Sequence, residues 1–203
     1  MKYLAIDTSG EYLTVIASGK KLAKSYVENC QLSHSVILMD EIEKCLKNAE
    51  IGLSDVGVVA CAVGPGSFTG IRIGVATAKA FAYAQNLKVL PVTTFELLAY
   101  NIVSERNKCV LIDARHGNYY ACVFDKDIKI VYEPSFISVN DIAKISENCD
   151  IVSDKPIDGY NAKVASPSEG FKLAVESKLI NATFDRETLI PLYVKKSQAE
   201  EEL

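Results

Sequence analysis

Hydrophobic and polar positions near the start of the chain alternate with the spacing of strands. Three short apolar runs lie at Lys2–Asp7, Tyr12–Ala17 and Leu22–Val27, and the last two are joined by a polar turn around Gly19. Apolar residues at alternate positions, bounded by turn residues, are typical of half-buried strands. The pattern therefore predicts a meander of three strands at the N-terminal end.

Helical spacing follows this meander. Ser33 is a suitable N-cap for a helix that runs to about Lys47. Strands and helices then alternate, so the predicted order of this half is βββαβαβα. The remaining predicted elements are a strand at Val56–Val63, a helix from the following glycine-rich turn to about Gln85, a strand at Val89–Val92 and a helix at Phe95–Val103.

The second half of the chain repeats the pattern of the first. Ile6–Tyr26 matches Ile112–Tyr132 without gaps, which places Asp7 on Asp113. A repeat of this length indicates a duplicated domain, because solenoid units are much shorter. The alternative is that two unrelated meanders look alike. A further helix and strand are predicted after the second meander, at Asn140–Asn148 and Asp150–Ser153.

Two βββαβα-type units in tandem are the plan of the actin-like ATPase (ribonuclease H-like) fold. We therefore predict a duplicated α/β fold with an N-terminal subdomain over residues 1–105 and a C-terminal subdomain over residues 106–203. Many functions share this fold, so the chemistry has to be argued from particular residues.

Composition narrows the functional classes. The 203 residues carry a net charge of −4, and 49% of them are hydrophobic. A chain that binds nucleic acid by itself usually has a basic surface, so we expect any contact with nucleic acid to be indirect. No apolar run is long enough for a signal peptide or a membrane helix, which predicts a cytoplasmic protein without membrane contact. The six cysteines form no CxxC pair and are expected to be small buried hydrophobes.

The segment from Gly64 to Gly70, with the sequence GPGSFTG, is shaped like a phosphate-binding loop. Its glycines permit close backbone approach, and Ser67 or Thr69 can cap the helix that follows. However, a P-loop requires a lysine directly after its last glycine, and here Ile71 and Arg72 follow. The dinucleotide fingerprint fails too, because Thr69 occupies its last glycine position. The sequence favours a tight strand-to-helix turn over a working phosphate site.

The two predicted helices of the first half have unusual faces. Small residues recur every four positions after the glycine loop, at Gly70, Gly74, Ala78 and Ala82. Such a face lets another backbone approach closely, either the sheet behind it or a partner. The first helix has an apolar stripe wider than one sheet requires, which leaves either a partner interface or plain burial. Its members are Leu32, Val36, Leu38, Met39, Ile42, Cys45 and Leu46.

Few residues are candidates for chemistry. Asp7 and Asp113 end the first strand of each repeat, where a carboxylate either holds magnesium or simply starts a turn. Thr8 and Ser9 either touch a phosphate or complete that turn. His34 and His116 form no zinc-binding pair, and Cys30 near His34 lacks a third group for a hydrolase.

Three stretches resemble the TsaB (YeaZ) family: LAIDTS from Leu4, GPGSFTGIRIGVATAKAFA from Gly64 and IDARHGNYYA from Ile112. The ending LIPLYVKKSQAEE from Leu189 is similar as well. The resemblance implies an actin-like fold without a working ATP site, no cofactor, no metal and no catalytic residue. It also implies that the chain supports a TsaD-type catalytic subunit together with a TsaE-type ATPase. That complex transfers a threonylcarbamoyl group onto N6 of the adenosine beside the anticodon of tRNA.

The resemblance further implies a homodimer when the chain is alone, formed through the surface that otherwise binds the TsaD-type subunit. It places that surface on the two unusual helices. The expected interface residues are Val36, Met39, Glu43, Leu46, Ile71, Gly74, Val75, Ala78 and Ala82. The expected vestigial nucleotide site comprises Asp7, Thr8, Ser9, Gly64, Gly66 and Asp113. The alternative hypothesis is an active kinase or ATPase of the actin-like fold that binds magnesium nucleotide between the subdomains.

Overall fold

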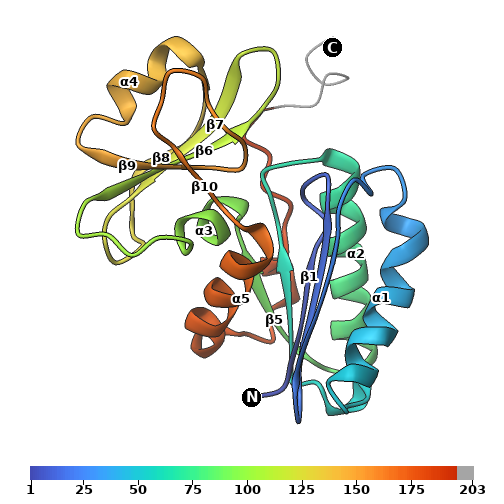
Figure 1. Cartoon of the computed structure of the whole chain (residues 1–203). Helices are drawn as coiled ribbons and strands as arrows, with labels where there is room; N and C mark the ends of the chain where they lie inside the picture. The colour runs from blue at the N-terminus through green and yellow to red at the C-terminus, as the bar shows by residue number, and fades with distance from the viewer. Residues whose placement is uncertain (196–203) are drawn as a thin grey trace. The chain divides into compact units, whose positions relative to one another are not determined.

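A computed structural model describes residues 1–195 and divides them into two compact units (Figure 1). Unit 1 consists of Met1–Thr94 and Ala174–Leu192, and unit 2 consists of Phe95–Leu173 and, of the described residues that follow Leu192, 193–195. The final part of the family-like ending, from residue 196 onward, lies outside the described residues.

Unit 1 is built on a five-stranded sheet of order β3-β2-β1-β4-β5. The first three strands form an antiparallel meander, while β4 and β5 run parallel to β1. The strands are β1 (Tyr3–Asp7), β2 (Leu13–Ser18), β3 (Leu22–Val27), β4 (Val58–Ala62) and β5 (Lys88–Val92). The helices of this part are α1 (His34–Asn48), η1 (Leu53–Asp55) and α2 (Phe68–Ala84).

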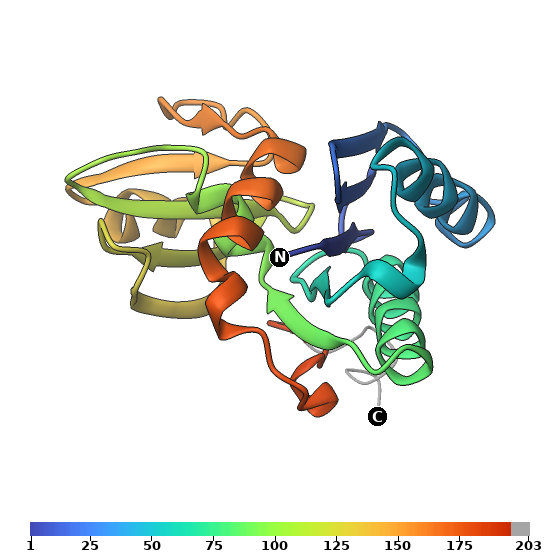
Figure 2. The ribbon, with the colours of Figure 1, turned by 90° about the horizontal axis from the view of Figure 1, so that it is seen from below.

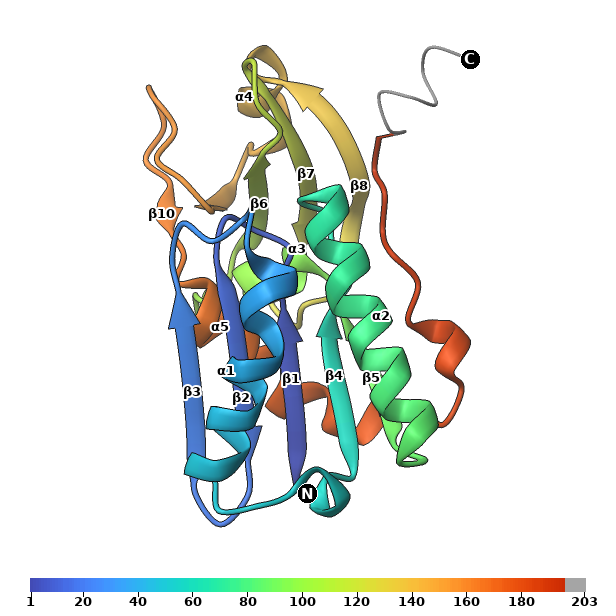
Figure 3. The same cartoon turned by 90° about the vertical axis from the view of Figure 1, so that its right-hand side faces the viewer.

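Helices α1 and α2 lie side by side on one face of this sheet (Figures 2 and 3). Inward-facing strand residues such as Leu4, Ile6 and Val15 form one core with Leu38 of α1 and Ala78 of α2. These residues are buried because each strand presents every second side chain to the helices. The core therefore fixes both helices on the same surface of unit 1.

Chain from the C-terminal part completes unit 1. Two residues of α5 (Pro167–Lys178) bond to the sheet of unit 1. Glu176 accepts a hydrogen bond from Tyr3 at 3.3 Å, and Lys178 donates to the Pro91 carbonyl at 3.3 Å. After η3 (Leu179–Asn181), the Val89 amide donates to the Thr183 carbonyl at 2.7 Å. The segment that contains η4 (Arg186–Thr188) thus extends the sheet beyond β5.

Unit 2 repeats this plan. Its sheet has the order β10-β9-β6-β7-β8, with β6 to β8 antiparallel and β9 and β10 parallel to β6. Counted from β8, the order and strand directions are those of unit 1, which confirms the duplicated α/β plan. The strands are β6 (Asn107–Asp113), β7 (Asn118–Phe124), β8 (Ile130–Ser138), β9 (Cys149–Ser153) and β10 (Lys163–Val164). The helices are α3 (Thr94–Ala99), η2 (Val139–Asp141), α4 (Ile142–Ile145) and the first half of α5.

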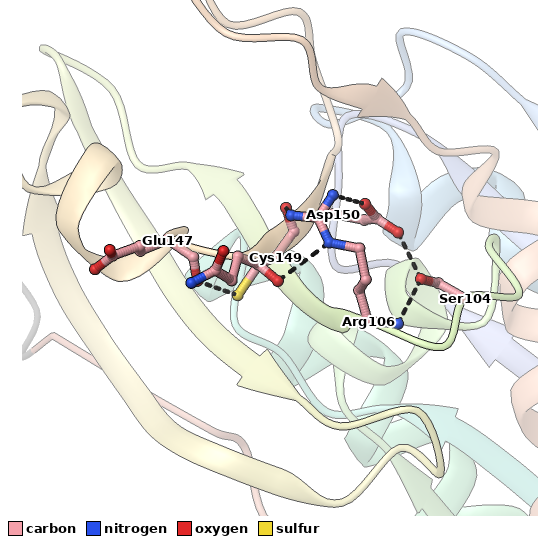
Figure 4. Close-up of polar contacts among 6 residues, drawn as sticks. Ser104, Arg106, Glu147, Cys149 and Asp150 are labelled. Atoms are coloured by element: carbon pink, nitrogen blue, oxygen red, sulfur yellow. Dashed lines mark hydrogen bonds and ion pairs between the residues drawn. The ribbon is translucent and has the colours of Figure 1, made fainter.

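A polar cluster ties the start of β6 to the start of β9 (Figure 4). Arg106 donates to Asp150 at 3.1 Å and to the carbonyls of Asn148 and Cys149. Ser104 donates to the other Asp150 oxygen and accepts from the Arg106 amide. Arg106 is exposed, and exposed ion pairs contribute little to stability. We therefore assign this cluster the role of aligning two parallel strands.

Two predicted helices differ from the structure. The helix predicted at Phe95–Val103 ends at Ala99, because the side chain of Asn101 takes up other partners. Its Nδ2 donates to the Leu97 carbonyl, and its Oδ1 accepts from the backbone amide of Ser166. The helix predicted at Asn140–Asn148 is only the short pair η2 and α4, and Asn148 has a positive φ of 58°. In addition, Ser33 precedes α1 but its hydroxyl donates to Cys30, so it provides no side-chain cap.

Gly70 provides a test of the packing between α2 and β1. A Cβ at Gly70 would overlap the Thr8 carbonyl oxygen, which is backbone and cannot rotate away. We expect Gly70→Ala to lower the free energy of unfolding by about 1–3 kcal/mol through overpacking, although alanine gains about 1 kcal/mol in helix propensity. Urea unfolding followed by circular dichroism measures this difference.

Gly57→Ala is the matched control, because the nearest atom to a Cβ there is the Lys2 carbonyl oxygen at 3.6 Å. That is an ordinary van der Waals distance, so the control should remain close to wild type. A Gly70→Ala variant that is as stable as wild type would show that this contact does not constrain the unit.

Candidate functional site

The polar residues after β1 bond to the chain itself. The Thr8 hydroxyl donates to the Gly70 carbonyl at 2.7 Å. The amide and hydroxyl of Ser9 both donate to Asp7 Oδ1, at 2.8 and 2.7 Å, and the Ser9 hydroxyl accepts from Thr94 at 3.2 Å. The side chains of Asp7, Thr8 and Ser9 are all buried. The hydroxyl groups of Thr8 and Ser9, for which the sequence left open a phosphate contact or a role in the turn, therefore have internal partners.

The glycine loop is also closed by backbone contacts within unit 1. The Ser67 amide donates to the Ser9 carbonyl at 2.7 Å, and the Thr94 amide donates to the Gly64 carbonyl at 2.7 Å. Gly66 adopts a positive φ, and a Cβ there would overlap the Ser9 carbonyl oxygen. The chain itself thus occupies the space that a side chain at Gly66 would need.

Of the two residues predicted as possible caps of α2, Ser67 provides the side-chain cap. The Ser67 hydroxyl accepts from the Gly70 amide at 3.2 Å, and the Ser67 carbonyl accepts from the Ile71 amide at 2.9 Å. Amides at a helix N-terminus attract anions only while they lack such partners. This cap therefore weakens the loop as a phosphate site.

Asp7 is fully buried, and its Oδ2 has no hydrogen-bond partner within unit 1. Burial raises the pKa of this carboxyl, while hydrogen bonds from Ser9 and Tyr12 and the electrostatic effect of the nearby His34 oppose the rise. The opposite residue on β2 is Thr14, whose buried hydroxyl also lacks a partner. The register of β1 and β2 therefore pairs two residues that each carry an unsatisfied oxygen, a pairing that the sequence analysis missed. Pairing the first two predicted strands residue by residue would have placed Thr14 opposite Asp7.

Asp113, the counterpart of Asp7 in the repeat, lies in unit 2 and has several partners. Its Oδ1 accepts from the Arg115 amide at 2.8 Å, and its Oδ2 lies 3.5 Å from Lys155. The Asp113 amide donates to Asp154. Arg115 and His116 follow with positive φ angles of 67° and 54°, so Asp113 stabilises an unusual left-handed turn.

Cysteine and histidine chemistry is limited by burial. Cys30 donates to the Val27 carbonyl, and His34 Nε2 lies 2.9 Å from the Tyr12 carbonyl, so these two side chains form no catalytic pair. Burial raises the pKa of the Cys45 thiol to about 11 and that of Cys109 to about 12. Within residues 1–195, no three acidic, cysteine or histidine side chains are grouped to hold a metal ion.

No helix in the same range is long and apolar enough to span a membrane.

The residues predicted to form the partner interface divide into two groups. Val36, Met39 and Glu43 of α1 are exposed. Six others are buried inside unit 1 and pack between the helices and the sheet: Leu46, Ile71, Gly74, Val75, Ala78 and Ala82. Since a buried side chain offers no surface to a partner, only the exposed residues of this set are retained for the contact surface proposed below. The small-residue stripe of α2 is used for close packing on β1 and β4, where Gly74 approaches Thr8 and Cys61.

An exposed apolar surface remains on α1. Leu32, Val36 and Met39 are 96%, 74% and 52% exposed. Glu41 accepts from Ser25 of β3, which marks the flank of α1 that faces β3. By the helical period, Met39 and Glu43 lie on the opposite flank, toward α2.

The matching flank of α2 is identified in the same way. Gly70 lies next to His34 of α1, and Ile73 and Phe81 share its side of α2 and are partly buried. We call Leu32, Val36, Met39 and Ile73, with the exposed Ala80, the α1–α2 face. Ile73 and Ala80 were absent from the predicted contacts, although the period of the helix already separates them from the buried stripe.

Comparison with known proteins defines the class first. Two solved structures from Pseudomonas aeruginosa, one of them described as YeaZ, superpose with TM-scores of 0.79 and 0.78. They are 21% and 22% identical and cover 96% and 95% of this chain, and 99% of their own. With the two matching sheets, this likeness shows the duplicated actin-like, ribonuclease H-like fold.

Residues 22–186 match the family model TsaD, described as tRNA N6-adenosine threonylcarbamoyltransferase. Because this is most of the chain, the chain belongs to that family, and its named relatives place it with the TsaB (YeaZ) proteins.

Two such relatives are called tRNA threonylcarbamoyladenosine biosynthesis protein TsaB. That of Buchnera aphidicola (subsp. Schizaphis graminum) is 35% identical over 120 residues, covering 58% of this chain and 57% of the relative. That of Escherichia coli is 29% identical over 130 residues, covering 63% and 56%. The chain thus spans about half the length of the curated relatives it matches.

The unsatisfied carboxyl of Asp7 leads to a prediction about pH. Asp7→Asn keeps the oxygen that accepts from Ser9 and replaces Oδ2 with an amide that can donate toward Thr14. Burial raises the pKa of Asp7 above the unfolded value, which is about 3.9. The carboxyl therefore contributes stability that is present below that pH and lost as the pH rises through the native pKa. We expect Asp7→Asn to be more stable than wild type at neutral pH, with the difference shrinking toward about pH 4.

Urea unfolding midpoints measured across this pH range test the expectation. Asp40→Asn, which neutralises an exposed carboxylate on α1, serves as the control. Parallel pH curves for wild type and Asp7→Asn would contradict the assignment of a raised pKa to Asp7.

Proposed function

We propose that this chain is a non-catalytic partner subunit in the synthesis of threonylcarbamoyladenosine on tRNA. In this proposal it binds a TsaD-type catalytic subunit, acts with a TsaE-type ATPase and meets tRNA within that complex in the cytoplasm. Alone, it pairs with a second copy through the same surface. The family match and the names of the relatives support this role.

The exposed apolar flank of α1 is the observation that carries the proposal. Val36 and Met39 of α1, and Leu32 just before the helix, remain exposed although the rest of the apolar stripe is buried in unit 1. Contiguous apolar surface of this kind marks interaction sites. Fully burying a side chain such as valine or methionine is worth about 1.5–3 kcal/mol, so the α1–α2 face can contribute most of the affinity of a subunit contact.

The surroundings of the glycine loop support a role without catalysis. In an active ATPase of this fold, the residues after β1 and the glycine turn would offer free donors and an ionised carboxylate to a magnesium nucleotide. Here Thr8, Ser9 and Ser67 have internal partners, and burial disfavours the charged form of Asp7. We therefore propose that Asp7, Thr8, Ser9, Gly64 and Gly66, with Asp113 in the repeat, keep the shape of a nucleotide site without its chemistry.

A reconstituted transfer assay with one component omitted tests the function. Transfer of the threonylcarbamoyl group to tRNA is measured with the TsaD-type subunit, the TsaE-type ATPase and the adenylate-forming enzyme, with and without this chain. The proposal predicts that modification collapses when the chain is omitted and that the chain alone hydrolyses no ATP. Equal modification without the chain, or ATP turnover by the chain alone, would favour the ATPase alternative.

Met39 tests the placement of the interface. Met39→Glu puts a charge in the middle of the α1–α2 face, and burying an unpaired charge costs several kcal/mol. We expect affinity for the TsaD-type subunit to fall by about 100-fold or more, while the fold remains intact because Met39 is exposed. Calorimetric titration of the two subunits measures the change.

Asn48→Glu is the matched control, since it adds the same charge at an exposed position on the flank of α1 that faces β3. It should bind like wild type. Normal binding by Met39→Glu would move the interface away from this face.

A further inference from the structure

The flank of α2 that faces away from α1 carries a row of aromatic rings paired with cations. Arg72 lies over the Phe68 ring at 4.9 Å, and Arg186 lies over the Tyr83 ring at 5.1 Å. Beside them, Lys88 lies 5.5 Å from the centre of the Phe184 ring. We call these three pairs the outer flank of α2. They come from both ends of α2, the start of β5 and the segment around η4, all within unit 1.

The position of the outer flank follows from the helical period. Phe68, Arg72, Lys79 and Tyr83 recur at intervals of four, seven and four residues, so they share one side of α2. That side is neither the buried stripe nor the flank with Ile73, which faces α1. Figure 3 shows the η4 segment on the side of α2 away from α1. The row is therefore separate from the α1–α2 face.

The rings at the C-terminal end of α2 are held firmly and still remain exposed. Arg186 donates to the Ala82 carbonyl from Nε and Nη2, to Asn86 at 2.7 Å and to the Phe184 carbonyl at 3.4 Å. The Tyr83 hydroxyl donates to Glu187 at 3.2 Å. Nevertheless, Tyr83 is 60% exposed and Phe184 is 53% exposed. Each ring has a cation on one face and leaves much of its remaining surface to solvent.

The charge of the row is positive although the whole chain is acidic. Four cations contribute: Arg72, Lys79, Lys88 and Arg186. Two carboxylates oppose them, of which Glu187 lies 3.6 Å from Lys79 and Asp185 accepts from the Glu187 amide. Cation–π pairs occur about once per 70–80 residues, so three on and beside one helix are a concentration. Rings alternating with cations are the arrangement that binds single-stranded nucleic acid, because bases stack on rings and phosphates meet cations.

We propose that the outer flank of α2 is an RNA-binding surface, on which unpaired bases stack against Tyr83 and Phe184 while Arg72 and Lys88 contact phosphates. This rests on the proposed function, which makes a tRNA loop with unstacked bases the RNA within reach. It also revises the expectation from net charge that contact with nucleic acid is only indirect: a local basic row is sufficient for a contact that the complex as a whole strengthens.

Fluorescence anisotropy with a labelled anticodon stem-loop RNA tests the proposal, using the full chain alone and together with the TsaD-type subunit. We expect the binding of wild type to weaken as salt concentration rises. Tyr83→Ala should weaken binding by about 5- to 100-fold, the range for loss of one stacked base. Tyr83→Phe keeps the ring and loses only the bond to Glu187, so it should bind nearly like wild type. Arg72→Ala should reduce the salt dependence by about one phosphate contact.

Tyr132→Ala, which removes an exposed ring from β8 of unit 2, is the control and should leave RNA binding by the chain alone unchanged. No RNA binding by wild type, or equal binding by wild type and Tyr83→Ala, would overturn the proposal. So would a Tyr83→Ala variant that binds RNA normally but loses the TsaD-type subunit, since the row would then be a protein contact. If the transfer assay requires the chain while RNA binding fails, only this inference falls. If transfer does not require the chain but binding depends on Tyr83, only the proposed function falls.

Discussion

The close approach of α2 to the end of β1 is the contact on which unit 1 depends. The Thr8 carbonyl lies where a Cβ of Gly70 would be, and the Ser9 carbonyl accepts from the Ser67 amide. These two contacts hold α2 close to β1 and determine the path of the glycine loop that leads into α2. Because both use backbone atoms, no rearrangement of side chains can relieve them, and α2 has a single position on the sheet.

This tight contact has consequences on both sides of α2. Inward, it engages the donors that a phosphate would need, so Thr8, Ser9 and Ser67 bond to their own chain. Outward, it leaves the remaining surface of α2 and its neighbour α1 free for other uses. One flank adjoins the exposed apolar residues of α1, and the opposite flank carries rings and cations. The proposed loss of nucleotide chemistry and the proposed docking surfaces are thus both compatible with this one packing arrangement.

The sequence analysis was most accurate where the pattern is local. The alternation of β1 to β3 and its echo in β6 to β8 depend on a period of two, which any buried sheet imposes. The N-cap of α2 was limited to Ser67 or Thr69 for the same reason, since capping involves only a few neighbouring residues, and the structure shows Ser67. By contrast, α3 ends early because Asn101 bonds to Ser166, a residue far away in the chain. No local pattern contains that information.

The amino-acid sequence by itself determined the duplicated α/β plan, the failed phosphate motifs and the presence of two helices with unusual faces. Only the tertiary structure decided how those faces are used. Ala78 and Met39 look equally suited to an interface along the sequence, yet Ala78 is fully buried against the sheet and Met39 is half exposed. The row of Phe68, Tyr83 and Phe184 with its cations joins α2 to a segment about a hundred residues later, as the contact of Tyr83 with Glu187 shows. Periodicity specifies which residues share a side of a helix, but the packing of other elements decides which side remains exposed.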